Sequence, residues 1–432
     1  MSIHAAGAER RFTSRSQMQI RTRATWALCA LNFFMADMQA GIGPFLGVFL
    51  QHHGWHPGPI GSVMTAGGIA GMLVTIPAGA FIDHTTKKRL TVVVTGLCTV
   101  LASFLILWSQ TPLVVTASQL ATAIAGAAIG PTVAGMTLGI VRQSGFTAQM
   151  GRNQAWNHAG NMVGAGLSGW LGWRFGMTAI FFLAAAFGAL AIASVLRVPE
   201  DAIDHQAARG LEASGLEESG PEASGTDDAK TAARAEGLRP FLHHKPLLVL
   251  AASLACFHLG NAAMLPLYGM AVVSAGKGDP AMFTATTVVV AQGVMILASL
   301  AAMRLVARWG YWPVLLLSFA ALPLRGALAG SFITHWGVWP VQALDGIGAG
   351  LQSVAVPGLV ARLLDRTGRV NVGQGVVMTA QGVGASLSPA LGGWLAQDLG
   401  YAAAFHVLGA IAVLSLVLWI GFSRAIRSAS AP

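Results

Sequence analysis

The stretch Gly160–Gly176, GNMVGAGLSGWLGWRFG, recurs 224 residues later as Gly384–Gly400, GASLSPALGGWLAQDLG. Both copies begin and end on glycine, and both contain the same Gly-Trp-Leu triplet at the same place. Self-similarity at a fixed offset is the sequence mark of a duplicated architecture. We therefore expect two structurally related halves.

The composition excludes most soluble proteins. Apolar residues make up 54% of the 432 residues and charged residues only 10%, whereas a soluble domain carries roughly 25% charged residues. Soluble enzymes, nucleic-acid-binding modules and disordered proteins are disfavoured, despite the net charge of +9. The three cysteines, Cys29, Cys98 and Cys256, lie inside apolar runs, which argues against a disulfide scaffold or a zinc site.

A helix needs about 20 mostly apolar residues to cross a bilayer. Twelve segments meet this need, and we predict an all-α membrane protein of twelve transmembrane helices. The predicted spans are 26–50, 59–82, 90–109, 113–140, 154–175, 177–197, 246–272, 282–303, 313–333, 337–361, 372–396 and 401–423.

The distribution of basic residues predicts the orientation. Of the 26 lysines and arginines, all but Arg174, Lys277 and Arg325 fall on the cytoplasmic side if the N-terminus is cytoplasmic. Both termini are then cytoplasmic, as an even number of spans requires. The richness in alanine, glycine and arginine indicates a bacterial source, so we expect a multi-pass protein of the bacterial inner membrane.

A polar segment divides the chain. Residues 198–245 contain the tandem pentapeptides LEASG, LEESG and PEASG, which bury too little apolar surface to become ordered. We predict a cytoplasmic N-terminal segment (1–25), a six-helix half (26–197), a disordered cytoplasmic linker (198–245), a second six-helix half (246–423) and a cytoplasmic tail (424–432). A docking role of the linker for a partner is the alternative.

Further segments repeat at nearly the same offset. Equivalent helices run in the same direction, so the halves are parallel repeats, an arrangement of alternating-access transporters whose substrate site lies at mid-membrane between the repeats. The pairs that match are Gln39 with Asn261, Pro44 with Pro266, and Gln119 with Gln342.

The segment Gly79–Lys88, GAFIDHTTKK, resembles the signature G-x-L-A-D-R-x-G-R-R of the major facilitator superfamily. The resemblance implies the twelve-helix major facilitator fold and secondary transport. It also implies that Gly79, Asp83, Lys87 and Lys88 form a cytoplasmic gating motif, in which the carboxylate and the cations stabilise one conformation. The alternative is that the lysines only set the orientation in the membrane, as the positive-inside rule requires. The second copy has Ala307 in place of the acid.

Two differences from the drug exporters of that family bear on the direction of transport. Proton-coupled drug exporters carry an arginine in the fourth helix, where this chain has Gln119, and a Gly-Pro pair in the fifth, where it has Gly164-Ala165. Both departures weaken the case for drug:proton antiport and leave the assignment as a transporter untouched.

Charged side chains inside a span are costly, about 2.5–3.5 kcal/mol on insertion scales, and are functional candidates. Asp37 in the first span and His258 in the seventh lie at mid-membrane depth. We predict Asp37 as the proton or substrate-cation site with His258 as its partner, since histidine and a buried carboxylate both titrate near neutral pH. The alternative is helix–helix hydrogen bonding. The flanking polar residues Asn32, Gln39 and Asn261 are expected to line the cavity, together with the repeat mates Gln119 and Gln342.

Arg325 and Asp345 lie at equal depth on consecutive spans. We predict an ion pair in which each charge cancels the other's desolvation cost, and a gating or anion-binding role of Arg325 is the alternative. Asn157 and His158 are expected one turn inside the cytoplasmic face, lining the inner vestibule.

The leading function is secondary transport by alternating access, with proton-coupled efflux of a drug or metabolite ahead of proton-coupled uptake of a polar metabolite or siderophore. A membrane-embedded sensor is a distant alternative. No HExxH, GxSxG or GxxxxGK[ST] motif occurs in the sequence, so we expect neither an enzyme nor an ATP-driven pump. The expected partners are a small-molecule substrate, protons and the lipid bilayer, without nucleic acid, cofactor or metal, and the protein is expected to be a monomer.

Overall fold

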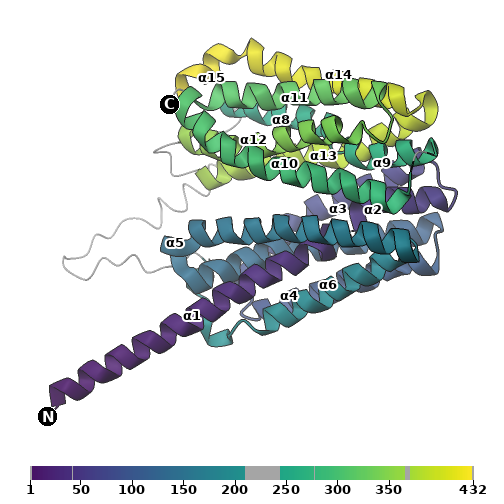
Figure 1. The fold of residues 1–432 in the computed structure, drawn as a ribbon. Coiled ribbons are helices and arrows are strands. Elements are labelled where there is room, and N and C mark those ends of the chain that lie inside the picture. Colours follow the sequence, from purple (N-terminus) through teal and green to yellow (C-terminus); the bar gives the residue numbers. More distant parts are fainter. Residues whose placement is uncertain (1, 41, 210–243, 277, 365–369, 431–432) are drawn as a thin grey trace.

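Helices account for almost all of the computed structural model, which describes residues 2–40, 42–209, 244–276, 278–364 and 370–430. The N-terminal half is built from α1 (Ser2–Ala40), α2 (Ile42–His52), α3 (Pro57–His84), α4 (Lys88–Trp108), α5 (Pro112–Phe175) and α6 (Thr178–Leu196). The C-terminal half comprises α8 (Lys245–Asn261), α9 (Met264–Ser274), α10 (Pro280–Trp309), α11 (Tyr311–Ser331), α12 (Val338–Leu363), α13 (Val370–Leu399), α14 (Tyr401–Gly421) and α15 (Ser423–Ser430). Figure 1 shows the halves as two bundles lying side by side.

Proline and glycine set many of the helix ends. Proline occupies the first turn of α3, α5 and α10, where its missing N–H needs no partner. Gly176 and Gly400 end the two copies of the repeat with φ of +87° and +85°, a left-handed conformation that only glycine adopts without strain. The repeated glycines therefore turn the chain in the same way in both halves.

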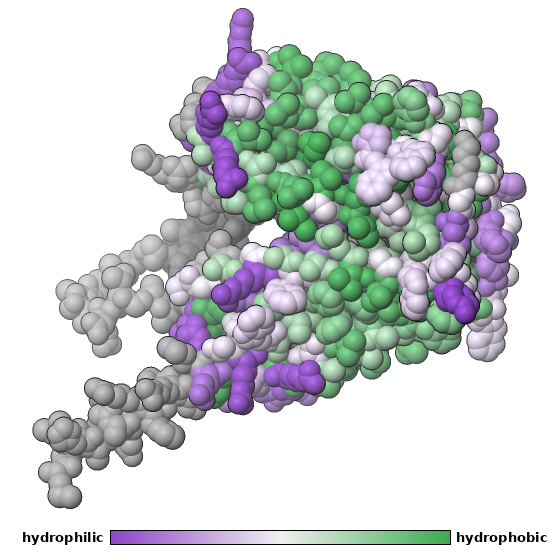
Figure 2. Space-filling model, viewed as in Figure 1, coloured by the Kyte–Doolittle hydropathy of each residue, from purple (hydrophilic) through white to green (hydrophobic). Residues whose placement is uncertain are grey.

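Ten segments of the described residues are long and apolar enough to cross a membrane. They correspond to ten of the twelve predicted spans. The other two, 154–175 in α5 and 372–396 in α13, are helical but do not form separate segments of that kind. Large apolar side chains such as Leu101, Leu297 and Val417 are exposed on the outer surface, and Figure 2 shows broad hydrophobic areas on both bundles. Such a surface suits lipid rather than water.

The fourth predicted span ends at residue 140 and the fifth begins at residue 154, with no structure predicted for the connection between them. The structure continues as helix through this region, and α5 runs from Pro112 to Phe175 with one break at Arg142, where φ is 59° and ψ is 179°. Non-glycine residues adopt this conformation only at a cost. The connection is thus a sharp turn at one residue.

Part of the predicted disordered linker is ordered. Residues 199–209, called the strap below, contain the short 3-10 helices η1 (Glu200–Ala202) and η2 (Ala207–Arg209). Ile203 and Ala207 are buried, and the backbone N–H of Asp204 donates to Gly139 O in α5. The prediction of disorder from 198 onward is therefore wrong for the strap, because its few apolar residues find a docking site on α5. Residues 210–243 lie outside the described part of the chain.

The halves meet on the side away from the chain termini. There Gln51 Nε2 donates to Ser274 Oγ at 2.7 Å, Trp394 Nε1 donates to Ser62 Oγ at 3.0 Å, and the backbone N–H of Ala390 donates to Thr65 Oγ1 at 2.9 Å. On the side of the termini, Figure 2 shows a notch between the two bundles. The conformation is closed on one face of the membrane and opens toward the other.

Candidate functional site

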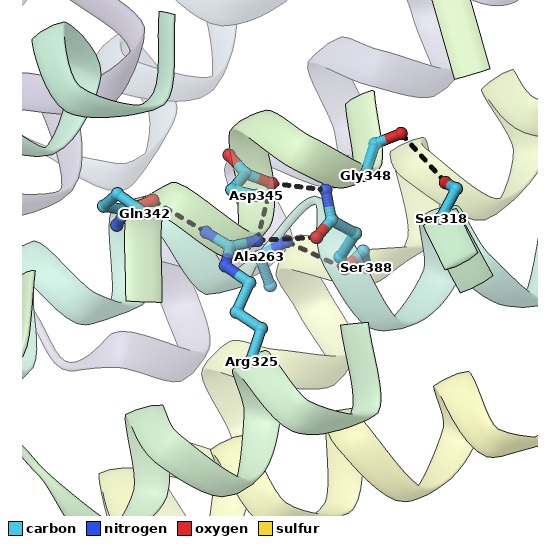
Figure 3. Close-up of polar contacts among 8 residues, drawn as sticks. Ala263, Ser318, Arg325, Gln342, Asp345, Gly348 and Ser388 are labelled. Atoms are coloured by element: carbon cyan, nitrogen blue, oxygen red, sulfur yellow. Dashed lines mark hydrogen bonds and ion pairs between the residues drawn. The ribbon is translucent and has the colours of Figure 1, made fainter. Parts of the chain in front are cut away.

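A buried ion pair organises the C-terminal half. The Arg325 side chain is fully buried in α11, and its Nη1 donates to Asp345 Oδ1 of α12 at 2.9 Å (Figure 3). Nη1 also donates to Asn261 Oδ1 at 2.6 Å, and Nη2 donates to Gln342 Oε1 at 3.0 Å. Asn261 Nδ2 in turn donates to Asp345 Oδ1 at 3.1 Å. The predicted ion pair is confirmed, and it recruits two residues that were expected only to line the cavity.

The network leaves one carboxylate oxygen of Asp345 outside it. The arginine and Asn261 both bond to Oδ1, and the other oxygen points away from the guanidinium in Figure 3. The Asp345 side chain is 15% exposed while that of Arg325 is 0% exposed. Asp345 therefore neutralises a cation that cannot reach water and still presents an oxygen to the space between the helices.

Asp37 has the opposite environment. It is 1% exposed, and both carboxylate oxygens are buried without a hydrogen-bond partner among the residues that the structure describes. The carboxyl lies against Gly164 of α5, where an added Cβ would come within 2.6 Å of the Asp37 Cγ. An isolated carboxylate anion buried in this way has no partner to offset its desolvation, which costs many kcal/mol.

His258 does not partner Asp37 in this structure. Gln381 Nε2 of α13 donates to His258 Nε2 at 3.2 Å. The predicted pair is not formed because Asp37 points into its own half toward α5, whereas His258 is held by a helix of the C-terminal half. Equal depth in the membrane, on which the prediction depended, does not fix the direction of either side chain.

Of the two polar residues predicted in the fifth span, His158 bonds to the other half and Asn157 bonds within its own. His158 Nδ1 donates to Gln292 Oε1 of α10 at 3.0 Å, and Asn157 Nδ2 donates to the Asn32 carbonyl oxygen at 3.3 Å. The Asn32 side chain donates to Leu28 O within its own helix. Sequence reasoning missed Gln292 and Gln381, although each is a lone amide inside an apolar run, a signal that could have found them.

Gln119 lines a cavity of about 490 Å³ between α3, α4 and α5. Its walls are mostly glycine, threonine and methionine, and none of the lining residues is charged. The Gln119 backbone packs on Gly67, so the fourth predicted span touches the second without an intervening side chain. The repeat mate, Gln342, is committed to Arg325, so the two glutamines differ in environment. The lining residues are Met64, Gly67, Gly68, Gly71, Met72, Thr75, Thr99, Gln119, Thr122, Ala123, Gly126, Ala127 and Pro389.

The two lysines of the predicted gating motif lie in different environments, one buried and one exposed. Lys88 is 1% exposed, and its Nζ donates to Ile82 O at 2.6 Å and to Thr85 O at 3.3 Å, tying the start of α4 to the end of α3. Lys87 is exposed. A Cβ at Gly79 would meet no neighbour. Lys88 is therefore a buried structural cation as well as a charge on one side of the membrane. The side chains of Asp83 and Gln39 lie outside the described part of the structure.

Comparison with known proteins places this arrangement in a family. A model of the Major Facilitator Superfamily matches residues 28–371 and 295–431. An uncharacterised MFS-type transporter of Mycobacterium tuberculosis, found in strains CDC 1551 and H37Rv, is 35% identical over 413 residues, covering 94% of each chain.

Solved structures share the fold at low identity. The nucleoside transporter NupG has a TM-score of 0.68 at 15% identity, covering 94% of this chain and 98% of its own. A bacterial homologue of the human lysosomal transporter Spinster, in an inward-facing and unoccupied conformation, has a TM-score of 0.67 at 13% identity, covering 96% and 98%.

Proposed function

Because the chain belongs to the major facilitator superfamily and so carries out secondary transport across a membrane, we propose that it exchanges protons for a small organic solute, with Asp37 as the proton carrier. The observation that supports this most directly is the Asp37 carboxyl, buried in α1 with both oxygens unpartnered. A group that must be neutral here and could be an anion when hydrated is suited to carry a proton.

The open face of the molecule fits the cycle of an exporter. The positive-inside rule assigns the face with the termini to the cytoplasm, so this conformation faces inward. An inward-facing state whose acid already holds a proton is the state from which an exporter collects its solute. Binding of the solute then favours release of the proton to the cytoplasm, and the empty return reloads Asp37 from outside.

Uptake of a polar solute is the second candidate, supported by the amide and imidazole groups between the halves. His158 with Gln292 and His258 with Gln381 present hydrogen-bonding groups that a neutral polar solute could engage. Gln119 stands where drug exporters carry an arginine. In this case the proton on Asp37 would enter together with the solute.

The test compares wild type with Asp37→Asn in everted bacterial membrane vesicles energised by respiration. Compounds are chosen by screening growth of an efflux-deficient host on toxic compounds and sole nutrients, and interior acidification is followed with a pH-sensitive dye. We expect an exported compound to discharge the gradient in wild type and to fail to do so in Asp37→Asn. Asp398→Asn, the same change at an exposed residue of α13, is the matched control.

Two results would contradict the proposal. If Asp37→Asn discharged the gradient as wild type does at matched expression, Asp37 would not carry the proton. If the compound that responds were a nutrient whose uptake by intact cells acidifies the cytoplasm, uptake would replace export.

A further inference from the structure

The contact between α1 and the second part of α5 is made by two glycines. A Cβ at Gly160 would lie 2.8 Å from the Phe33 carbonyl carbon, and one at Gly164 would lie 2.6 Å from the Asp37 Cγ. Spaced four residues apart, the two glycines lie on one face of α5, so α1 approaches along a groove without side chains. The floor of that groove is where the Asp37 carboxyl rests.

The second half contains the same contact with one difference. The repeat offset of 224 places Gly384 on Gly160, and Gly384 likewise packs on its neighbour α8, where a Cβ would come within 3.0 Å of Leu259 N. The same offset places Ser388 on Gly164. The Ser388 hydroxyl accepts the backbone N–H of Ala263 at 2.9 Å (Figure 3). In the C-terminal half this position carries the Ser388 hydroxyl, which has a hydrogen-bond partner. In the N-terminal half it is Gly164, and the space that a side chain would take is occupied by the Asp37 carboxyl, which has no partner among the described residues.

We propose that Gly164 is a positioning residue for proton binding: its missing side chain admits the Asp37 carboxyl and denies it a hydrogen-bond donor, which keeps the acid neutral. The inference rests on the proposed role of Asp37 as proton carrier. A donor at this position would stabilise the carboxylate, because hydrogen bonds to the charged form favour it. Proton release then requires α1 and α5 to separate, so that water replaces the glycine surface.

The hydrogen bond between His158 and Gln292 joins α5, the helix that contains the glycine groove, to the C-terminal half. His158 lies on α5 six residues before Gly164, and its partner belongs to α10. Movement of the C-terminal half against α5 therefore acts on the same helix that covers Asp37. This connection accounts for how opening and proton release could be coupled.

No element packed against Asp37 carries a formal charge at its depth among the described residues. Helix α6 has no titratable side chain. In the other elements that contact α1, the charged residues lie near helix ends or near the α5 break at Arg142, Cys98 is an exposed thiol midway along α4, and His158 is bonded to Gln292. The groups concerned are Arg21, Arg23 and Cys29 of α1, His52 of α2, Lys88, Arg89 and Cys98 of α4, Arg142, Arg152, His158 and Arg174 of α5, and Glu200 and Asp201 of η1.

The experiment measures the pH dependence of solute-driven proton movement in proteoliposomes for wild type, Gly164→Ser and Gly166→Ala. Gly166→Ala is the matched control, because a Cβ there meets nothing within 4 Å. We expect Gly164→Ser to shift the profile toward acid by about one pH unit, a tenfold loss of proton affinity. Gly166→Ala should keep the wild-type profile. A merely structural role of Gly164 would lower activity at every pH without moving the profile.

A second measurement keeps the inference testable if Gly164→Ser does not fold. Infrared difference spectra of wild type against Asp37→Asn should show the carbonyl band of a carboxylic acid free of hydrogen bonds at neutral pH. Absence of that band, or an unshifted profile in a folded Gly164→Ser protein, would overturn the inference. If Asp37→Asn abolishes proton movement and yet Gly164→Ser is unshifted, only the role of Gly164 fails. If Asp37→Asn retains proton movement, the proposed function fails first.

Discussion

At the scale of single residues, the two intramembrane acids show how environment divides similar groups into different tasks. Asp345 lies beside a buried guanidinium and accepts two hydrogen bonds on one oxygen, so its contacts join α8, α11 and α12. Asp37 has neither a cation nor a hydrogen-bond donor beside it among the residues that the structure describes. The first acid is suited to hold helices together and the second to exchange a proton.

The ion pair gives a residue-scale prediction. Arg325→Met leaves Asp345 without its cation, and breaking such a pair from one side should cost about 3–5 kcal/mol of stability. The double variant Arg325→Met with Asp345→Leu removes both charges and should recover much of the loss. Thermal unfolding in detergent, followed by tryptophan fluorescence, measures both. Arg304→Met, at an exposed arginine of α10, is the control, and a single variant as stable as that control would contradict the structural role.

At the scale of elements, the strap fixes the turn between the fourth and fifth predicted spans. Arg142 Nη2 donates to Asp204 Oδ2 at 2.9 Å, and Arg89 Nη1 forms an ion pair with Glu200 at 2.8 Å. Asp204 Oδ1 accepts the backbone N–H groups of Gln206 and Ala207. The strap thereby holds the one residue of α5 whose backbone is strained.

Asp204 gives the element-scale prediction. The hydrogen bond from the Ala207 backbone N–H holds the pKa of Asp204 below its ordinary value. The Gln206 backbone N–H and the positive charge of Arg142 act in the same direction. An acid with a lowered pKa contributes its stability above its unfolded-state pKa, about 3.9, and loses it as the pH falls through the lower folded value. The strap should therefore be fully docked at neutral pH and weaken only in strong acid.

Hydrogen exchange at neutral pH checks this expectation. Asp204→Asn should raise exchange across residues 199–209 and at the turn around Arg142, because the charged acceptor is lost. Asp201→Asn, an exposed acid of the same segment, should leave exchange unchanged. Equal protection in Asp204→Asn and wild type would show that the apolar contacts of Ile203 and Ala207 hold the strap by themselves.

At the scale of the whole molecule, the two halves are joined on one face by polar contacts between helices. Gln51 of α2 bonds to Ser274 of α9 and, at 2.8 Å, to the hydroxyl of Tyr401 in α14. These side chains belong to different halves, so alternating access must break the bonds when the closed face opens. Hydrogen bonds of about 1 kcal/mol each suit a gate that must release.

A cross-link across that gate tests the motion. In a background without the native cysteines, Gln51→Cys with Ser274→Cys should be joined by a short thiol cross-linker, because the wild-type side chains touch. Transport should stop on cross-linking and return after reduction, while either single variant should be insensitive to the reagent. Full transport in the cross-linked protein would mean that this face does not open during the cycle.

The fold was largely predictable because the membrane restricts what a chain can do. Spans need apolar length, backbone groups in lipid need helices, and the duplicated Gly-Trp-Leu stretches reveal two related halves. The Arg325–Asp345 pair followed from equal depth on adjacent antiparallel helices. The spans at 113–140 and 154–175 did not show that the chain between them is helical apart from a turn at Arg142. The predicted disorder is wrong for the strap, whose docking site lies elsewhere in the chain.

Sequence by itself therefore determined which segments are apolar enough for the membrane, how deep their polar residues lie and which kinds of side chain they carry, since hydrophobic length and charge cost act locally along the chain. Only the tertiary structure decided which way each polar side chain faces. In the packed helices Asp37 of α1 lies against Gly164 and not against His258. Gln342 accepts a hydrogen bond from Arg325, whereas its repeat mate Gln119 faces a cavity. Those directions depend on contacts between helices far apart in sequence, which no local pattern records.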